Sequence, residues 1–431
     1  MAGCGGFCGG VDTGFPIGQF TNNLNWGLLR GYAAATTDSG HDNMGLGRTY
    51  AEWAFNNRPA EIDWGYRSIH EVTRVSKALI CVYYGQPAQY SYFAGCSTGG
   101  RQAMVEVLRF PEDFDGVISG APALDYTGLV ATWMSWIVQG INKVPLVDGF
   151  AFDSVAVNDI RERVLERCDD ADGDTDGLIC DPRRCPDIRF KGLSLTKAQL
   201  KALDQIYSKP REDDDDDEDI LYEGVIPYGS EIYWPIWVPG MAGTDLNPLP
   251  LNLIGPFNDG FLKYMAFKKD DPDFTADDFD FDDDPERLKF MGRIYNATGT
   301  NISKFKQLGG KILMYHGWAD SIVPPLYTVD YYDRVVATMG GLGKTQDFFR
   351  LFMVPGMDHC STAQSLEFSG LGTSIGLDNF DALGALENWV EKGIAPDSLW
   401  ATGKSLDGVP VEKFLYPYAP DGGDGDDDDD D

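Results

Sequence analysis

The sequence predicts an α/β fold interrupted by a large insertion, and three observations lead to this prediction. A short aromatic strand at 90–94 is followed by a glycine-flanked turn and by a helix with apolar spacing. Strand–helix alternation resumes at residue 310 and continues to about residue 390. Between the two, residues 125–305 are rich in Trp, Pro and Asp and contain few such units. A chain of 431 residues is long enough for one large domain with an insertion of this size.

Charge is distributed unevenly along the chain. The formal net charge is −33, and much of it comes from acidic stretches at 211–219, 270–284 and 426–431. Runs of this kind are typical of solvated loops or disordered tails. The negative balance argues against nucleic acid or an anionic membrane as a partner. No run of 18 apolar residues is present, so no membrane span is predicted.

These features predict the domain organisation. We expect residues 1–124 and 306–420 to form the α/β domain and residues 125–305 to form an inserted lid. Residues 421–431 are expected to be an acidic disordered tail. Within the lid, the segment 231–239 concentrates aromatic side chains, which indicates either ordinary lid core or a wall of the substrate pocket.

The N-terminal elements precede the aromatic strand. Residues 3–10 are too rich in glycine for a strand or helix and predict a backbone loop that can approach a ligand closely. A short strand is expected at 28–36, followed by a polar stretch at 38–41. A helix is expected at 66–80, because one of its faces carries Ile69, Val72, Ser76, Leu79 and Ile80.

The turn after the aromatic strand carries a catalytic motif. Residues 95–99 fit the pattern G-x-S-x-G, and the spacing of Ala103, Met104, Val107 and Leu108 predicts the helix that follows. Such a turn lifts the Ser97 hydroxyl above the edge of the sheet and leaves the next backbone N–H available to an oxyanion. The sequence therefore predicts a nucleophile at Ser97. The alternative is a plain glycine-rich turn, which leaves Cys96 unexplained.

Later elements continue the alternation. Strands are expected at 114–119, 311–315 and 348–354, and helices at 327–339 and 383–389. The inward face of the helix at 327–339 carries Val335, Val336 and Met339. Two polar segments follow these strands directly, at 316–320 and 355–360.

A base and an acid for Ser97 are expected in those two segments. Among the four histidines, His359 is the best candidate for the base, because it follows a late strand directly. Asp320 can then orient its imidazole, and the order Ser97, Asp320, His359 is that of α/β-hydrolases. Asp358 is the alternative carboxylate, although a residue next to the base rarely curls round to meet its ring.

The other histidines are weaker candidates. His70 lies within a predicted helix, and His316 is expected to be a structural neighbour of Asp320. His41 lies in an early polar loop and stays open as a base. For the oxyanion we expect the backbone N–H of Thr98 together with one from Gly5 or Gly6.

The eight cysteines give an independent indication of proximity. Cys96 precedes Ser97 and Cys360 follows His359, so a serine and a base within hydrogen-bond reach make a Cys96–Cys360 disulfide geometrically plausible. Cys4, Cys8, Cys81 and Cys180 are left without an assigned partner, and Cys81, at the end of a helix, is expected to be a buried thiol. Eight cysteines and the sequons at Asn296 and Asn301 favour an oxidising, secreted setting, although no signal peptide is expected at this N-terminus.

A second constellation lies in the lid. Residues 168–178 alternate aspartate with glycine, which makes an oxygen-rich, tightly turning loop suited to Ca²⁺. The stretch from 172 is similar to an EF-hand loop, but its twelfth position is Arg183 where a bidentate Glu is needed. We therefore expect a stand-alone calcium loop closed by Cys168 and Cys185. Its expected ligands are the side chains of Asp169, Asp172 and Asp176 and the carbonyls of Asp174 and Leu178.

The segments around these residues resemble the tannase and feruloyl esterase family. The resemblance rests on the CS–D–HC pattern of Cys96-Ser97, Asp320 and His359-Cys360 and on motifs at 92–102, 110–116, 316–320 and 354–360. It extends from about residue 3 to about residue 395. It implies an α/β-hydrolase fold with a large inserted lid domain that carries a structural Ca²⁺, a triad at the positions above and a bridge between the two adjacent cysteines.

The resemblance also implies a function. Family members are secreted esterases for small aromatic esters derived from plant cell walls or tannins, so we expect a feruloyl esterase. A galloyl ester hydrolase, or one for mono-hydroxyethyl terephthalate, is the alternative within the family. The hypothesis from another class is a catalytically weak hydrolase fold that acts as an aromatic-ligand binding module, because family members usually have further strands ahead of the glycine loop.

Overall fold

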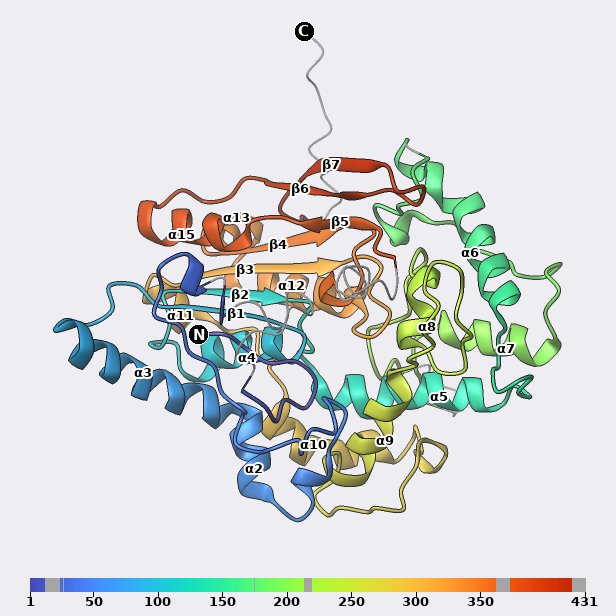
Figure 1. The fold of residues 1–431 in the computed structure, drawn as a ribbon, viewed down its shortest axis with the longest axis horizontal. Coiled ribbons are helices and arrows are strands. Elements are labelled where there is room, and N and C mark those ends of the chain that lie inside the picture. Colours follow the sequence, from blue (N-terminus) through green and yellow to red (C-terminus); the bar gives the residue numbers. More distant parts are fainter. Residues whose placement is uncertain (12–23, 26, 174, 213–218, 362–372, 421–431) are drawn as a thin grey trace, which may run out of the picture.

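A four-stranded parallel sheet forms the centre of the computed structural model, which describes residues 1–11, 24–25, 27–173, 175–212, 219–361 and 373–420. The strands lie in the order β1-β2-β3-β4 and are β1 (Tyr92–Cys96), β2 (Gly116–Gly120), β3 (Lys311–Gly317) and β4 (Phe349–Val354). Because all pairs are parallel, the carboxyl ends of the strands meet at one edge of the sheet, on the right in Figure 1.

The elements predicted around this sheet are present. The strands expected at 90–94, 114–119, 311–315 and 348–354 correspond to β1 to β4. The expected helices are present, each longer than predicted, and are α3 (Ser68–Tyr84), α4 (Thr98–Arg109), α12 (Pro325–Met339) and α15 (Ala382–Lys392). Two short helices, α2 (Arg58–Ile62) and α13 (Leu342–Gln346), complete this part of the chain.

Both faces of the parallel sheet are buried. Ile312 and Met314 of β3 lie in the core that contains α4 and α12, whereas Leu313 and Tyr315 lie in the core that contains α15. Successive side chains of a strand point to opposite faces, so a strand covered on both sides needs an unbroken apolar run. The segment 312–315 of β3 meets this requirement.

The residues between β2 and β3 fold mainly into helices, and in the described part of 125–305 none joins either sheet. They are α5 (Met134–Asn142), α6 (Ser154–Cys168), α7 (Lys197–Ile206), α8 (Trp234–Trp237), α9 (Ile254–Tyr264), α10 (Asp284–Tyr295) and α11 (Ser303–Gln307). Figure 1 shows α5 to α9 to the right of the sheet and below it. No described helix is both long and apolar enough to cross a membrane.

A second, antiparallel sheet was not predicted from the sequence. It consists of β5 (Gly376–Asn379), β6 (Leu399–Lys404) and β7 (Pro410–Leu415), in that order. A signal for the β6–β7 hairpin exists in the dipeptide Asp407-Gly408, where Gly408 has a φ of +76°. The Tyr418 N–H donates to the Leu351 carbonyl at 2.7 Å, which connects the end of this hairpin to β4.

The strand predicted at 28–36 is wrong. Leu28 and Leu29 lie in a helical turn with exposed side chains, and residues 32–39 have irregular backbone. The outer edge of β1 is occupied instead by the first residues of the chain. Ala2 forms a parallel bridge with Ala94, and the Ala2 N–H donates to the Ala35 carbonyl at 2.8 Å. The segment 28–36 reaches this edge through the Ala35 carbonyl and the Thr36 hydroxyl, which bond to the N–H and the carbonyl of Ala2, and it does not pair as a strand.

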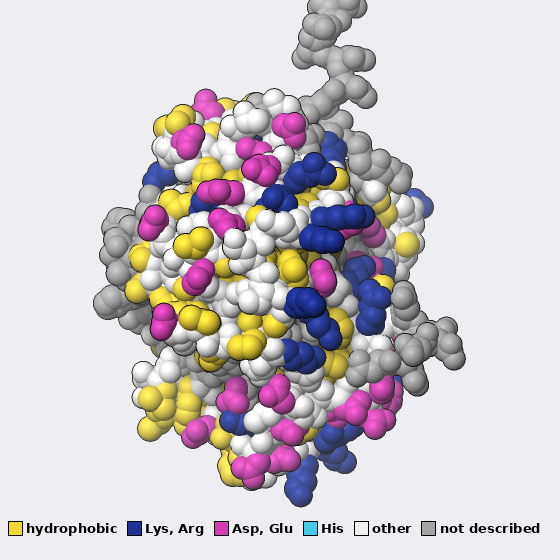
Figure 2. All heavy atoms as spheres, turned by 90° about the vertical axis from the view of Figure 1, so that its right-hand side faces the viewer, with side chains coloured by type: hydrophobic (Ala, Val, Ile, Leu, Met, Phe, Trp, Pro, Cys, Tyr) yellow, Lys and Arg dark blue, Asp and Glu magenta, His cyan; other side chains and the backbone are white. Residues whose placement is uncertain are grey.

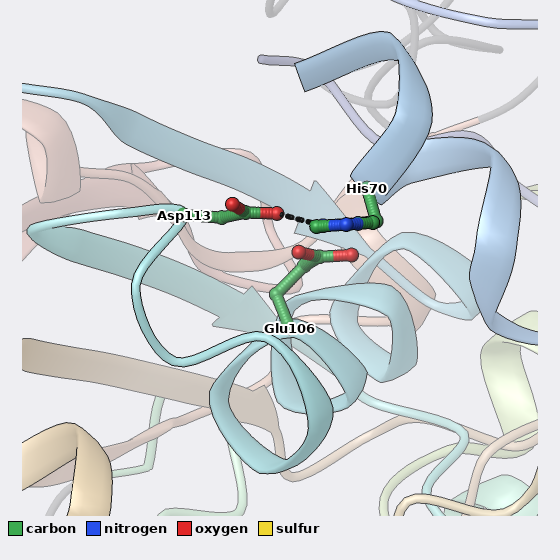
Figure 3. A group of neighbouring side chains, drawn as sticks. All are labelled: His70, Glu106 and Asp113. Atoms are coloured by element: carbon green, nitrogen blue, oxygen red, sulfur yellow. Dashed lines mark hydrogen bonds and ion pairs between the residues drawn. The ribbon is translucent and has the colours of Figure 1, made fainter. Parts of the chain in front are cut away.

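A polar cluster lies between α3, α4 and the loop that follows α4 (Figure 3). His70 Nδ1 and Asp113 Oδ2 lie 2.6 Å apart, and the His70 ring stacks on Phe110 with centroids 4.0 Å apart. Glu106 faces them with 1% exposure, and neither of its carboxylate oxygens has a hydrogen-bond partner among the described residues. Burial, and then the charge of Asp113, raises the pKa of Glu106 to about 10. Glu106 is therefore uncharged at neutral pH.

Three disulfides are present among the described residues. Cys96–Cys360 and Cys168–Cys185 are the two that the sequence predicted. The third, Cys4–Cys8, joins two cysteines that had no assigned partner. The expectation that Cys81 is buried is wrong, because the apolar face of α3 turns away from the core in its last turns and leaves Cys81 exposed. The Cys180 thiol lies 3.8 Å from Lys413 Nζ.

Candidate active site

Ser97 occupies a sharp turn between β1 and α4. Its backbone has φ 64° and ψ −124°, a conformation that a residue other than glycine adopts only when its surroundings enforce it. The Ser97 N–H donates to the Gly120 carbonyl at 2.9 Å, which ties the turn to β2. Residue 95 has to be glycine because the turn brings the backbone of Gly99 so close that a Cβ at position 95 would lie 2.7 Å from it. The turn therefore has the strand–turn–helix geometry that exposes a nucleophile.

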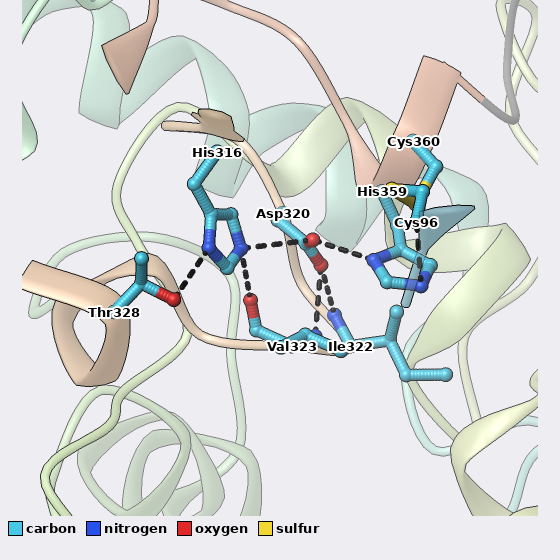
Figure 4. Close-up of polar contacts among 8 residues, drawn as sticks. All are labelled: Cys96, His316, Asp320, Ile322, Val323, Thr328, His359 and Cys360. Atoms are coloured by element: carbon cyan, nitrogen blue, oxygen red, sulfur yellow. Dashed lines mark hydrogen bonds and ion pairs between the residues drawn. A yellow bond between two sulfur atoms is a disulfide. The ribbon is translucent and has the colours of Figure 1, made fainter. Parts of the chain in front are cut away.

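Asp320 and His359 meet beyond the carboxyl ends of β3 and β4 (Figure 4). His359 Nδ1 lies 2.6 Å from Asp320 Oδ2. The other carboxylate oxygen, Oδ1, accepts the N–H groups of Ile322 at 3.0 Å and Val323 at 2.8 Å. Both side chains are buried, so the carboxylate is held in one position and in turn fixes the orientation of the imidazole.

A second histidine supports Asp320 from the other side. His316 Nε2 lies 3.2 Å from Asp320 Oδ2 and 2.8 Å from the Val323 carbonyl oxygen, and Nδ1 lies 2.8 Å from Thr328 Oγ1. His316 is thus the structural neighbour that the sequence indicated. Burial alone would raise the pKa of Asp320, but its interactions with His359 and His316 outweigh burial and hold that pKa below its ordinary value.

The remaining two histidines have other contacts. His41 stacks on Trp53 with ring centroids 3.7 Å apart. His70 belongs to the cluster between α3 and α4. The carboxylate that meets His359 at the strand ends is that of Asp320. His359 Nε2 lies 3.9 Å from the Sγ atom of its chain neighbour Cys360, which is bridged to the serine elbow.

The Cys96–Cys360 disulfide joins the two loops of this site. Its Cα atoms are 6.1 Å apart although 264 residues separate the cysteines in sequence. Cys360 and Ser361 both have positive φ, at 54° and 59°, so the chain bends tightly where the bridge is formed. Because Ser97 and His359 are the chain neighbours of the bridged residues, the disulfide holds the serine elbow and the histidine loop against each other (Figure 4).

The N-terminal glycine loop packs on the start of α4. Thr98 Oγ1 donates to the Gly6 carbonyl at 2.8 Å, and Arg48 Nη1 donates to the Gly5 carbonyl at 3.2 Å. The backbone N–H groups of Gly5, Gly6 and Thr98 have no hydrogen-bond partner among the described residues. The first N–H groups of a helix lack intrahelical partners in any case, so Thr98 has a donor to offer beside Ser97.

One lid aromatic contacts the histidine of the site. Trp237, at the end of α8, lies edge-on to the His359 ring with centroids 5.4 Å apart and an interplanar angle of 88°. Its indole N–H is buried and has no hydrogen-bond partner among the described residues. The sequence placed Trp237 in an aromatic segment with two interpretations, and no spacing in the sequence indicated its contact with His359.

The acidic loop of the lid is folded tightly. Asp169 Oδ1 accepts the Gly177 N–H at 2.9 Å, and Asp176 Oδ1 accepts the Leu178 N–H at 3.0 Å. The two ends of the loop therefore lie side by side, next to the Cys168–Cys185 bridge. Of the other expected calcium ligands, Asp174 and the side chain of Asp172 lie outside the described residues.

The sheet and its strand-end residues define a class of fold. A parallel sheet with a serine at the elbow after β1, an aspartate after β3 and a histidine after β4 has the arrangement of the α/β-hydrolases. Here the fold carries a large insertion between β2 and β3. The chain belongs to the tannase and feruloyl esterase family, a family of carboxylic ester hydrolases, whose sequence profile matches residues 1–422.

Individual relatives agree with this membership. A probable feruloyl esterase from Arthroderma benhamiae is 30% identical over 419 residues, which covers 92% of this chain and 72% of the relative. A mono(2-hydroxyethyl) terephthalate hydrolase from Piscinibacter sakaiensis is 31% identical over 470 residues, covering 95% and 75%. The crystal structure of feruloyl esterase B from Aspergillus oryzae superimposes with a TM-score of 0.77 at 26% identity, covering 97% of this chain and 79% of that one.

Proposed function

We propose that this chain hydrolyses carboxylic esters of phenolic acids, with Ser97 as the nucleophile, His359 as the general base and Asp320 as the residue that orients the base. The observation that carries the proposal is the 2.6 Å contact between His359 and Asp320 in a loop bridged to the serine elbow by Cys96–Cys360. A buried carboxylate, an imidazole and a strained serine in this chain order are the parts that acyl transfer requires.

The chemistry follows from these positions. Ser97 Oγ attacks the ester carbonyl carbon while His359 takes the hydroxyl proton, and Asp320 stabilises the imidazolium. Collapse of the tetrahedral intermediate breaks the bond to the alcohol oxygen, which receives the proton from His359. A water molecule, deprotonated by His359, then hydrolyses the acyl-enzyme and releases the acid. The Thr98 N–H, with that of Gly5 or Gly6, would stabilise the oxyanion in both steps.

We favour feruloyl esters over galloyl and terephthalate esters as substrates. Relatives named as feruloyl esterases, together with a buried aromatic ring beside the base at Trp237, support an aromatic acyl group. The test compares hydrolysis of methyl ferulate, methyl gallate and mono(2-hydroxyethyl) terephthalate by the purified protein. We expect the highest kcat/KM for methyl ferulate. A folded protein that hydrolyses none of the three would contradict the proposal.

The binding-module hypothesis predicts a different result. A hydrolase fold without turnover would bind phenolic acids but would not react with a fluorophosphonate, because such reagents phosphonylate only an activated serine. The burial of Asp320 and His359 and their short contact favour the enzyme. Absence of labelling in a protein that binds ferulate would favour the module.

We also propose that the acidic loop at 169–178 holds a structural Ca²⁺. Its donors would be the expected Asp169, Asp172 and Asp176 side chains and the Asp174 and Leu178 carbonyls, an all-oxygen set suited to this ion. The side-by-side placement of Asp169 and Gly177 supports the fit. A bound cation there would neutralise crowded carboxylates and stabilise the lid. We expect EDTA to lower the melting temperature and Ca²⁺, but not Mg²⁺, to restore it. The variant Asp169→Asn should show neither effect.

We also propose that the protein is secreted and glycosylated. Three disulfides favour an oxidising compartment. Of the two sequons, Asn301 is exposed and suited to carry a glycan. Asn296 is less suited, because its Nδ2 donates to Asp125 Oδ1 at 2.6 Å and Thr127 Oγ1 at 2.9 Å. Expression in a glycosylating host followed by peptide mass spectrometry should find sugar at Asn301.

A further inference from the structure

The lid contains a cationic segment within an acidic chain. Residues 183–201 contain six cationic side chains and one acidic side chain, Asp187, although the whole chain has a net charge of −33. We call the six cationic residues the cationic band, and they are Arg183, Arg184, Arg189, Lys191, Lys197 and Lys201. A local excess of one sign against the overall charge is not expected from composition alone, so the band calls for a physical explanation.

Most of the cationic band is available to an outside partner. All six side chains belong to exposed residues. Arg183 is paired with Asp181 at 2.6 Å. Arg189, Lys191, Lys197 and Lys201 form no ion pair with any described residue. Figure 2 faces the side of the molecule on which α6 and α7 lie in Figure 1, and it shows several dark blue side chains on this face with magenta side chains among them.

The backbone that carries the band is fixed at several points. The Cys168–Cys185 bridge ties its start to the end of α6. Arg163 Nη1 of α6 donates to the Arg189 carbonyl at 3.0 Å. Helix α7, which carries Lys197 and Lys201 one turn apart, begins in a capping box. A partner that binds here therefore meets charges on an ordered surface and loses less free energy to ordering on binding.

The cationic band is connected to the active site through packed aromatic rings. Tyr207, which ends α7, lies 5.7 Å from Trp234 of α8 between ring centroids. The same short helix ends in Trp237, which contacts His359. The outer surface of the lid carries the charges, and its inner layer contacts the catalytic histidine.

We propose that the cationic band binds a carboxylate-bearing polysaccharide, a polyuronate chain, to which the phenolic ester is attached. This inference rests on the proposed function and names the polymer that presents the ester. Arginine and lysine pair with carboxylates, and arginine does so with two parallel hydrogen bonds. A single polysaccharide strand offers one carboxylate per sugar, so it can pair with several exposed cations at once.

The charge of the rest of the molecule favours a thin partner. A bilayer or a nucleic acid duplex would bring a broad anionic surface against a protein of net charge −33, and the repulsion would extend over roughly 10 Å at 0.1 M salt. A single polyuronate strand brings fewer anionic charges than a bilayer or a duplex against the acidic residues beside the cationic band, among them Asp181 and Asp187. The partner is therefore expected to be a flexible single chain rather than a surface.

The test uses a quadruple variant and a matched control in the full-length protein. Arg189→Gln, Lys191→Gln, Lys197→Gln and Lys201→Gln together remove four charges from the cationic band. The control variant removes four exposed lysine charges elsewhere, by Lys268→Gln, Lys269→Gln, Lys289→Gln and Lys304→Gln. Binding of fluorescent polygalacturonate is measured against neutral dextran, anionic phospholipid vesicles and duplex DNA, and turnover of methyl ferulate is measured in parallel.

We expect the unmodified protein to bind polygalacturonate in preference to all three competitors, with an affinity that falls as salt rises. The band variant should bind at least about tenfold more weakly, the control variant should keep the affinity, and both should hydrolyse methyl ferulate at the original rate. The inference would be overturned if both variants lost affinity for polygalacturonate equally. It would also be overturned if the unmodified protein bound dextran, vesicles or DNA as well as it binds polygalacturonate. If the unmodified protein did not hydrolyse methyl ferulate, that result would instead overturn the proposed function.

Discussion

The part of the chain that builds the parallel sheet and the lid at 125–305 differ in how they hold their functional groups. In the sheet part, Ser97, Asp320 and His359 follow directly after strands whose register fixes their positions, and all three are buried. In the lid, the six residues of the cationic band are exposed and lie on α7 or between α6 and α7. The proposed reacting groups thus depend on strand ends, whereas the residues proposed to attract a partner lie on loops and on α7.

The two disulfides that the sequence predicted sharpen the contrast. Cys96–Cys360 spans 264 residues and joins the two loops of the active site, while Cys168–Cys185 spans 17 residues within the lid. We expect the first disulfide to hold the proposed site together and the second to order one loop. The effects of variants in the two parts should therefore differ both in which property changes and in how much it changes.

The largest effect is expected for Ser97→Ala. Without the nucleophile no acyl-enzyme forms, and kcat for methyl ferulate should fall by roughly 10⁴-fold or more. The melting temperature should change little, because the substitution removes only one hydroxyl. Steady-state kinetics and a thermal melt check both points, and activity within tenfold of the original would remove Ser97 from the mechanism.

Asp320→Asn should follow closely, with a loss of roughly 10³- to 10⁴-fold in kcat, because an amide cannot stabilise the imidazolium and favours the wrong tautomer. Its pH dependence has a definite sign. The pKa of Asp320 is below its ordinary value, so the ionised form stabilises the fold at and above about pH 4 and this contribution is lost as pH falls further. Acid unfolding should therefore begin at higher pH in the variant. Identical acid-unfolding curves would contradict the assigned contacts.

The next largest effect is expected for removal of the Cys96–Cys360 disulfide. Cys96→Ser with Cys360→Ser should lower the free energy of unfolding by about 5 kcal/mol in the chain-entropy estimate and reduce kcat as well. The matched lid variant, Cys168→Ser with Cys185→Ser, should cost about 3 kcal/mol by the same estimate and leave kcat for methyl ferulate nearly unchanged. Urea unfolding and kinetics of both pairs make the comparison, and equal kinetic losses would show that the two bridges do not differ in role.

Glu106→Gln should give a smaller effect of opposite sign. The raised pKa means that Glu106 must take up a proton on folding at neutral pH, which costs stability as pH rises above the unfolded pKa of about 4.5. A neutral amide avoids this cost, so the variant should be more stable at pH 8, by no more than about 5 kcal/mol, and about equally stable at pH 4.5. Glu106→Asp, which keeps the acid, is the control. A gain in stability that does not depend on pH would contradict the protonation of Glu106 in the folded protein.

Much of the sheet and of its site could be predicted because the evidence for both is local in sequence. Ser97, Asp320 and His359 each follow an apolar strand, and Cys96 and Cys360 mark the two loops that meet. The hairpin of β6 and β7 was missed although Asp407-Gly408 signals its turn. The strand at 28–36 was wrong because apolar composition does not reveal that Ala2 already occupies the edge of β1.

The lid was harder to predict for a physical reason. Its helices bury aromatic side chains against one another from distant positions, as Tyr207 and Trp234 do, and such packing leaves no fixed spacing in the sequence. The Cys4–Cys8 bridge was missed for a related reason, since a glycine-rich loop carries no periodic pattern that places two thiols together.

One measurement tests the central claim that two distant loops form a single catalytic site. The unreduced protein is labelled with a fluorophosphonate, digested and mapped by mass spectrometry. We predict a disulfide-linked peptide pair that contains Cys96 and Cys360 and carries the label on Ser97. A label on another serine, or Cys96 and Cys360 recovered as thiols, would contradict the claim.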